Sequence, residues 1–178
     1  PHNEENVAAA VVVAKKLGIP EQDIVSAIKD FKGLEHRLEF VRKVEEVSFY
    51  NDSFATGPRP TMAAINSFDE NITLILGGSD KGHGFDELAE AVVSNKNVNR
   101  IILIGEIRKR IAEALTKAGF QGSIVDMGQS TMEEIVETSF KETREGGVVV
   151  LSPAAASFDM FENYKERGMK FKEAVRNL

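Results

Sequence analysis

Short apolar runs alternate with amphipathic helical segments along most of this chain, and this alternation constrains the fold more than any other feature. Runs of apolar or β-branched residues indicate strands, and apolar residues recurring every three or four positions indicate helices. Strands that alternate with helices form a mostly parallel sheet covered on both faces. The predicted strands span residues 38–44, 47–51, 72–77, 100–104, 123–127 and 148–151, and the predicted helices among them span residues 60–68, 85–94, 107–118, 131–142 and 158–175.

Two short helices precede this pattern. Residues 3–17 carry apolar side chains at helical spacing and end at Gly18, and Pro20 opens a second helix that ends near Gly33. A unit of this size cannot bury a core of its own. The chain also opens inside a helical pattern without an initiator Met. We therefore expect a domain cut from a longer chain, with residues 1–33 as the helical tail of a preceding domain and residues 34–178 as an α/β domain.

Composition excludes several classes of protein. The net charge is −6 and the isoelectric point about 5.2, with no local basic stripe, which argues against nucleic-acid binding. There is no cysteine, and the three histidines lie far apart, so we expect neither disulfides nor a metal site. No apolar run is long enough to span a membrane and no secretion signal is visible. The predicted compartment is the cytoplasm.

The polar segments that follow three of the strands are the candidate site. They are Asn51-Asp-Ser, the Gly-rich segment 77–84 and the small-residue segment 152–157. In open parallel sheets, ligands bind at the carboxyl ends of the strands, so these three segments should meet there. Ser157 is expected to cap the last helix, with Asp159 in its first turn. A helix N-terminus after a small-residue turn favours an anionic ligand.

Each candidate also has a plainer interpretation. Lys81, in the Gly-rich segment, could pair with a carboxylate or phosphate, or it could be a solvated lysine on a flexible turn. The segment is neither a P-loop nor a GxGxxG motif. Asp52 could hold a cation or a nucleotide and Thr56 could bind a ligand, or both could belong to a capping turn before the next helix. Arg37 could reach a phosphate or form a surface ion pair. From the residues alone, the chain is an α/β domain that binds a small anion.

Five segments resemble motifs of the Mur ligases, in that family's order. They are His2-Asn-Glu-Glu-Asn6, Gly33-Leu-Glu-His-Arg37, Asn51-Asp-Ser with Ala55-Thr56, Gly77-Gly-Ser-Asp-Lys81, and Leu151-Ser-Pro-Ala-Ala-Ala-Ser-Phe-Asp-Met-Phe161. The resemblance covers essentially the whole chain. Its last motif is most similar to the members that add D-glutamate. The family implies a Rossmann-like, three-layer domain for residues 34–178, which closes over a central domain that binds ATP through a P-loop.

The resemblance implies a ligase of peptidoglycan precursor synthesis. ATP would phosphorylate the carboxylate of UDP-N-acetylmuramoyl-L-alanine, and the amine of D-glutamate would attack the acyl phosphate and release phosphate. ATP and Mg²⁺ would be bound mainly by the preceding domain. The 178 residues alone should therefore fold but not catalyse. The partners implied are these three small molecules, with no nucleic acid or membrane, and the protein is expected to be monomeric.

The resemblance also assigns roles to individual residues. Those expected to bind D-glutamate are Lys81, Thr56, Ser157, Phe158 and Tyr164, and those expected to face the nucleotide are Asn6, Arg37 and Asp52. One position departs from the family, whose loop often reads NDSKATN. Phe54 stands in place of that lysine and cannot supply its charge. Phe54 is the one feature that favours a non-catalytic amino-acid-binding domain. A Mur-type ligase for a different amino acid is another alternative.

Overall fold

The structure, a computed structural model, describes residues 2–31 and 33–178, and for His2, Asn3 and Glu4 the backbone alone. The chain divides into two compact units, Pro1–Gly33 and Leu34–Leu178. The division falls at the boundary expected from the sequence. The assignment of the first unit to a preceding domain stays a prediction.

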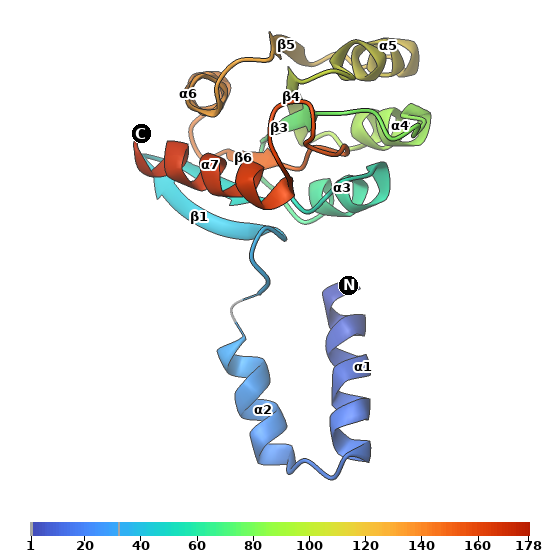
Figure 1. Cartoon of the computed structure of the whole chain (residues 1–178), viewed down its shortest axis with the longest axis vertical. Coiled ribbons are helices and arrows are strands. Elements are labelled where there is room, and N and C mark those ends of the chain that lie inside the picture. The colour runs from blue at the N-terminus through green and yellow to red at the C-terminus, as the bar shows by residue number, and fades with distance from the viewer. Residues whose placement is uncertain (1, 32) are drawn as a thin grey trace. The chain divides into compact units, whose positions relative to one another are not determined.

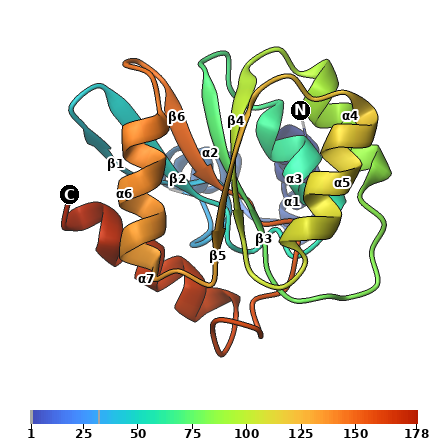
Figure 2. The same ribbon diagram turned by 90° about the horizontal axis from the view of Figure 1, so that it is seen from above.

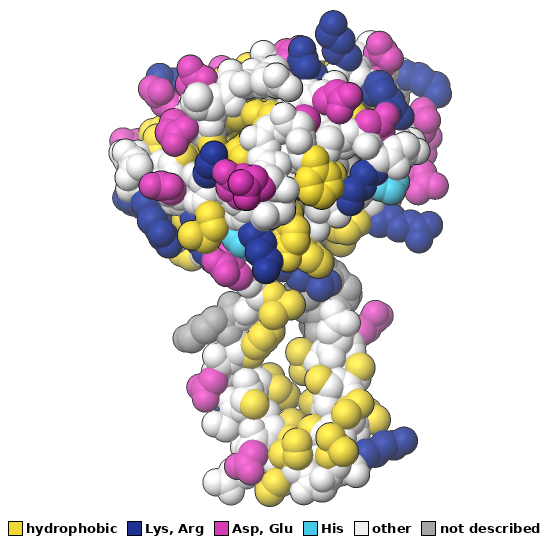
Figure 3. Space-filling view, viewed as in Figure 1, with side chains coloured by type: hydrophobic (Ala, Val, Ile, Leu, Met, Phe, Trp, Pro, Cys, Tyr) yellow, Lys and Arg dark blue, Asp and Glu magenta, His cyan; other side chains and the backbone are white. Residues whose placement is uncertain are grey.

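The first unit is a pair of helices, α1 (His2–Lys16) and α2 (Glu21–Asp30). Gly18, with a φ of 76°, reverses the chain between them, and Pro20 immediately precedes α2. Among the side chains described in this unit, Ile24 alone is buried, whereas Leu17 is 74% exposed and Phe31 60% exposed. Figure 3 shows hydrophobic side chains spread over both helices. The unit has apolar surface but almost no core, as its size predicts.

The second unit is a six-stranded sheet between two layers of helices. The strands are β1 (Glu39–Val44), β2 (Val47–Asn51), β3 (Ile72–Gly77), β4 (Val98–Ile104), β5 (Ser123–Gly128) and β6 (Val148–Leu151), in the order β1-β2-β6-β3-β4-β5. β1 pairs antiparallel with β2 through a tight turn at Glu45, and the other pairs are parallel. α3 (Pro58–Ile65), α4 (Asp86–Ser94) and α5 (Arg108–Ala118) cover one face, and α6 (Met132–Glu142) and α7 (Tyr164–Arg176) cover the other (Figures 1 and 2). The predicted three-layer α/β fold is confirmed.

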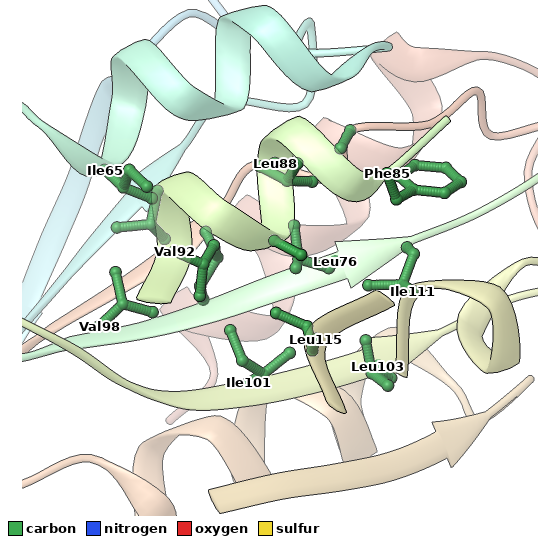
Figure 4. Close-up of a cluster of buried hydrophobic side chains, with 14 of the residues drawn as sticks. Ile65, Leu76, Phe85, Leu88, Val92, Val98, Ile101, Leu103, Ile111 and Leu115 are labelled. Atoms are coloured by element: carbon green, nitrogen blue, oxygen red, sulfur yellow. The ribbon is translucent and has the colours of Figure 1, made fainter. Parts of the chain in front are cut away.

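The central strands are buried on both faces, which explains their continuous apolar sequence. Every residue of β3 and of β6 is buried. One core lies between the sheet and α3, α4 and α5, where Leu76, Leu88 and Leu103 meet (Figure 4), and the second lies under α6 and α7 around Phe49 and Phe171. Full burial of each such side chain contributes about 1.5–3 kcal/mol. None of the helices in the described residues is long and apolar enough to cross a membrane.

The last helix begins later than the sequence predicts. α7 starts at Tyr164 rather than near Phe158, and its cap is Asn163, whose side chain accepts hydrogen bonds from the N–H groups of Lys165 and Glu166. The Asp159 carboxylate accepts from the N–H of Glu106, beyond the end of β4, at 2.7 Å. This tertiary bond holds residues 157–163 as a connection across the strand ends. Ser157 begins one isolated turn and does not cap the helix.

Candidate functional site

Three loops meet at the carboxyl edge of the sheet. The β2 loop (residues 51–56) and the β3 loop (residues 77–84) flank the β6 loop (residues 152–163), because β6 pairs in parallel with both β2 and β3. From β3 the chain proceeds to α4 on one face, and from β6 it proceeds to α7 on the other. The strand order therefore reverses between these two strands. Such a switch point is where open α/β sheets bind ligands, and the structure brings the predicted segments together there.

Arg167 of α7 joins the β2 and β6 loops. Its side chain is 1% exposed. The guanidinium donates to the hydroxyl of Ser53 (2.9 Å), the carbonyl of Ser53 (2.9 Å), and the carbonyls of Ala155 (3.1 Å) and Ala156 (3.2 Å). Burial lowers the pKa of Arg167 to about 10, so the group remains charged at neutral pH. The sequence analysis missed this residue, although Arg167 shares a helix face with Phe171 and Val175, which are both buried.

The β3 and β6 loops are joined by backbone hydrogen bonds. The N–H of Gly77 donates to the carbonyl of Pro153 at 2.8 Å, and that of Ser79 to the carbonyl of Ala156 at 2.9 Å. Gly78 has a φ of 145°, and a Cβ there would collide with the Ala156 carbonyl. The first two glycines of the predicted anion loop therefore serve this contact between loops. The segment left to meet a ligand is residues 79–84.

A cleft lies beside two of the predicted binding residues. Its volume is about 600 Å³, and it is lined by Gly57, Pro58, Arg59, Pro60, His83, Gly84, Asp86 and Glu87. Thr56 directly precedes one wall, and Lys81 lies two residues before His83 of the other. Lys81 is exposed and Thr56 half-buried. The cleft thus lies between the segments that follow Thr56 and Lys81.

The remaining residues predicted to bind the amino acid line the same edge. Ser157 is 2% exposed, and its carbonyl accepts from the N–H groups of Met160 and Phe161. Phe158 is 70% exposed, and its backbone N–H donates a hydrogen bond to the Ser79 hydroxyl at 3.2 Å. The Tyr164 ring packs edge-on against Phe54 at a centroid distance of 5.0 Å. Phe54 is half exposed and offers an apolar edge where the resembling loops carry a lysine.

Asp52 is held inside the domain by groups of the protein. It is 4% exposed, and its two carboxylate oxygens accept from the N–H of Leu38 (3.1 Å) and the hydroxyl of Ser152 (2.7 Å). Burial raises the pKa of Asp52 to about 6, and the bonds from Ser152 and Leu38 oppose this shift. The carboxylate thereby ties the first residues of the domain to the end of β6. Its predicted role toward a nucleotide stays a prediction.

Arg37 stands beside a buried polar network. His36 is 4% exposed, and its Nδ1 lies 2.9 Å from the Asn51 amide. Burial lowers the pKa of His36, although Glu35 and Glu39 oppose the shift. A metal could in principle be held by Glu35, His36 and Glu39, whose ligand atoms lie within 4.8 Å of one another. The Lys172 ammonium, however, lies 2.7 Å from both carboxylates and already supplies a cation.

The predicted nucleotide residues are divided between the two units. Arg37 is exposed at the start of the second unit. Asn6 is an exposed residue of α1 in the first unit. The prediction that Asn6, Arg37 and Asp52 face one nucleotide therefore stays a prediction.

Comparison with known proteins decides the family. Residues 36–155 match the family described as Mur ligase, glutamate ligase domain. The chain belongs to the Mur ligase family. This confirms the resemblance of the motifs, and the match covers the β2 and β3 loops and the first four residues of the β6 loop.

Curated relatives and solved structures agree with this placement among the Mur ligases. The UDP-N-acetylmuramoylalanine--D-glutamate ligases of Caldicellulosiruptor bescii and of Thermoanaerobacter sp. are 41% and 44% identical over 177 and 178 residues, 99% of this chain. The chain spans 38% of the length of each. The structure of UDP-N-acetylmuramate-alanine ligase MurC from Thermotoga maritima matches this structure with a TM-score of 0.71 at 15% sequence identity. The match covers 99% of this chain and 38% of the Thermotoga maritima chain. This last likeness shows the shared fold.

Replacing the buried guanidinium should destabilise this Mur ligase domain strongly. In Arg167→Met, the hydroxyl of Ser53 and three buried carbonyls lose their donor. We expect a loss of about 3 kcal/mol or more in the free energy of unfolding, measured by urea denaturation of the 178-residue chain. The control is Lys165→Met, an exposed position on the same helix, which should change the stability by less than about 0.5 kcal/mol. Equal stabilities of the two variants would contradict the role of Arg167.

Asp52→Asn should remove a pH-dependent loss of stability. The folded pKa of about 6 lies above the usual 3.8, so the folded state binds the proton more tightly. This contribution is complete below pH 3.8 and is lost as the pH rises through 6. Between these two pH values, the free energy of unfolding of the variant should therefore rise relative to that of the wild type, by up to about 3 kcal/mol. Urea unfolding at several pH values measures this, with the exposed Asp69→Asn as control. Parallel pH curves for wild type and Asp52→Asn would refute it.

Proposed function

We propose that this chain is the C-terminal part of an ATP-dependent ligase that adds D-glutamate to UDP-N-acetylmuramoyl-L-alanine during peptidoglycan precursor synthesis. The observation that supports it most is the identity of 41–44% to ligases of that name along 99% of the chain. Because the chain spans 38% of those relatives, the sites for ATP and for the muramoyl nucleotide would lie largely in a preceding part of the protein. We place the protein in the cytoplasm, as a monomer.

In this proposal, the carboxyl edge of the sheet binds D-glutamate. The Lys81 ammonium would pair with a carboxylate, and the hydroxyls of Thr56 and Ser157 would donate to carboxylate oxygens. Phe158 and Tyr164 would border the aliphatic part of the amino acid. The place of Ser157 in the β6 loop, where the three loops meet, supports this assignment, as does a cleft whose walls begin one residue after Thr56 and two residues after Lys81.

The domain would contribute mainly by positioning. A carboxylate oxygen of the muramoyl substrate attacks the γ-phosphate of ATP, and ADP leaves. The amine of D-glutamate then attacks the acyl carbon, loses a proton, and phosphate leaves as the amide bond forms. Holding the amine against the acyl phosphate makes the second step effectively intramolecular. Asn6, Arg37 and Asp52 would face the nucleotide, and Mg²⁺, held mainly by the preceding part, would neutralise phosphate charge.

The experiment that tests this function is amino-acid-dependent phosphate release by the full natural protein. With ATP and UDP-N-acetylmuramoyl-L-alanine present, the addition of D-glutamate should cause the release of phosphate. The addition of L-alanine, L-lysine or meso-diaminopimelate should not. The 178 residues alone should give none. Release with another amino acid would indicate a ligase of different specificity. Binding of D-glutamate without release by the full protein would indicate a non-catalytic domain, the alternative that Phe54 favours.

Lys81→Ala should weaken the use of D-glutamate specifically. The loss of one hydrogen bond to a charged group corresponds to about 1.5–3 kcal/mol, which is an increase of about 10- to 150-fold in the KM for D-glutamate. The KM for ATP should change much less. Lys96→Ala, an exposed lysine near the amino end of β4, is the control. An unchanged KM for D-glutamate in Lys81→Ala would remove Lys81 from the site.

A further inference from the structure

The loop that carries Lys81 has little to fix it from within. Gly82 has a φ of 74°, and a Cβ at either Gly82 or Gly84 would meet open space. The residues from Lys81 to Gly84 are all exposed. An internal constraint comes from Asp80, whose Oδ1 accepts from the N–H of Gly82 at 2.7 Å. A loop of this kind would sample many conformations unless another element held it.

Arg110 of α5 holds this loop on both sides of Lys81. One guanidinium nitrogen donates to Oδ2 of Asp80 at 2.6 Å, and the other terminal nitrogen donates to the carbonyl of His83 at 2.9 Å. The guanidinium carbon also lies 5.6 Å from the centre of the Phe85 ring. A planar group that donates in two directions while resting on an aromatic ring is well suited to fixing a loop.

We propose that Arg110 is a positioning residue for D-glutamate, which orders the Lys81 loop before the substrate arrives and neutralises Asp80 beside it. The inference rests on the proposed function. The hydrogen bonds of Arg110 go to the two sides of the loop, so the role inferred for it acts through the loop. Asp80, next to Lys81 in the chain, would otherwise present a negative charge beside the lysine that meets the carboxylates of the amino acid.

The contribution of Arg110 should appear in substrate affinity rather than in stability. The side chains of Arg110 and Asp80 are 46% and 44% exposed, and exposed ion pairs stabilise folded proteins little. If the loop is not ordered beforehand, binding must order it, which lowers the affinity. We therefore expect Arg110→Ala to raise the KM for D-glutamate about two- to tenfold, with little change in the KM for ATP, in kcat or in Tm.

The kinetic test uses the full natural protein. Arg110→Lys keeps the charge but cannot donate in the same planar fork. Its KM for D-glutamate should lie between those of Arg110→Ala and the wild type. In an Asp80→Asn background, Arg110→Ala should raise the KM less than it does alone, because the two residues act together. The control is Lys141→Ala on α6, which breaks an exposed pair with Glu137 at 2.6 Å and should leave the KM for D-glutamate unchanged.

A second measurement does not depend on catalysis. In ¹⁵N relaxation of the 178-residue chain, the amides of Lys81 and Gly82 should become more mobile in Arg110→Ala than in wild type or Lys141→Ala. An unchanged KM with unchanged mobility would overturn the inference about Arg110 alone, and so would equal losses in kcat, both KM values and Tm. A wild-type protein without D-glutamate-dependent release would instead overturn the proposed function, and with it the substrate side of this inference.

Discussion

The arrangement of the candidate site at the carboxyl edge of the sheet depends on the hydrogen bonds of the buried Arg167 guanidinium. It is the largest fully buried side chain of the domain, and its donors go to a hydroxyl and three carbonyls rather than to a carboxylate. A buried charge without its partners is costly, so the β2 loop, the β6 loop and α7 must adopt this arrangement together. The proposed binding residues Thr56, Ser157 and Tyr164 lie on these three segments. Their mutual placement is therefore a consequence of folding and does not need the ligand.

The β3 loop is connected to the same edge in a different way. Its first half is fixed by the close approach of Gly77 and Gly78 to the β6 loop, and its second half by contacts with Arg110 on the surface. The part that bears Lys81 is thus the least constrained part of the candidate site. In the proposed function, the order of this part of the site would therefore depend on Arg110 more than that of the hydroxyls opposite.

The sequence predicted the strands and the meeting of the loops well, because both follow from apolar periodicity and from the geometry of parallel sheets. β2, β3 and β6 have the predicted bounds. The late start of α7 was missed, although Asn163 is a cap residue that the sequence carries; the contact of Asp159 with Glu106, which lies far away in sequence, carried no such signal. Arg167 carried a weak signal, a cation on an apolar helix face. Arg110 carried none, because its partners lie in a loop that precedes it by a whole strand and helix.

The substitution at Phe54 bears on the nucleotide side of the proposed site. In family loops that read NDSKATN, the resemblance implies that the lysine lies near the nucleotide phosphates. Here that position holds a ring that packs on Tyr164. In the proposed function, the phosphate charge would then be met by Arg37 and by groups of the preceding part of the protein. Hydroxyl and N–H dipoles stabilise an anion only over short distances, so the position of each cation matters more when there are fewer of them. For this reason, we expect Arg37 to influence nucleotide affinity more in this protein than it would with a lysine at position 54.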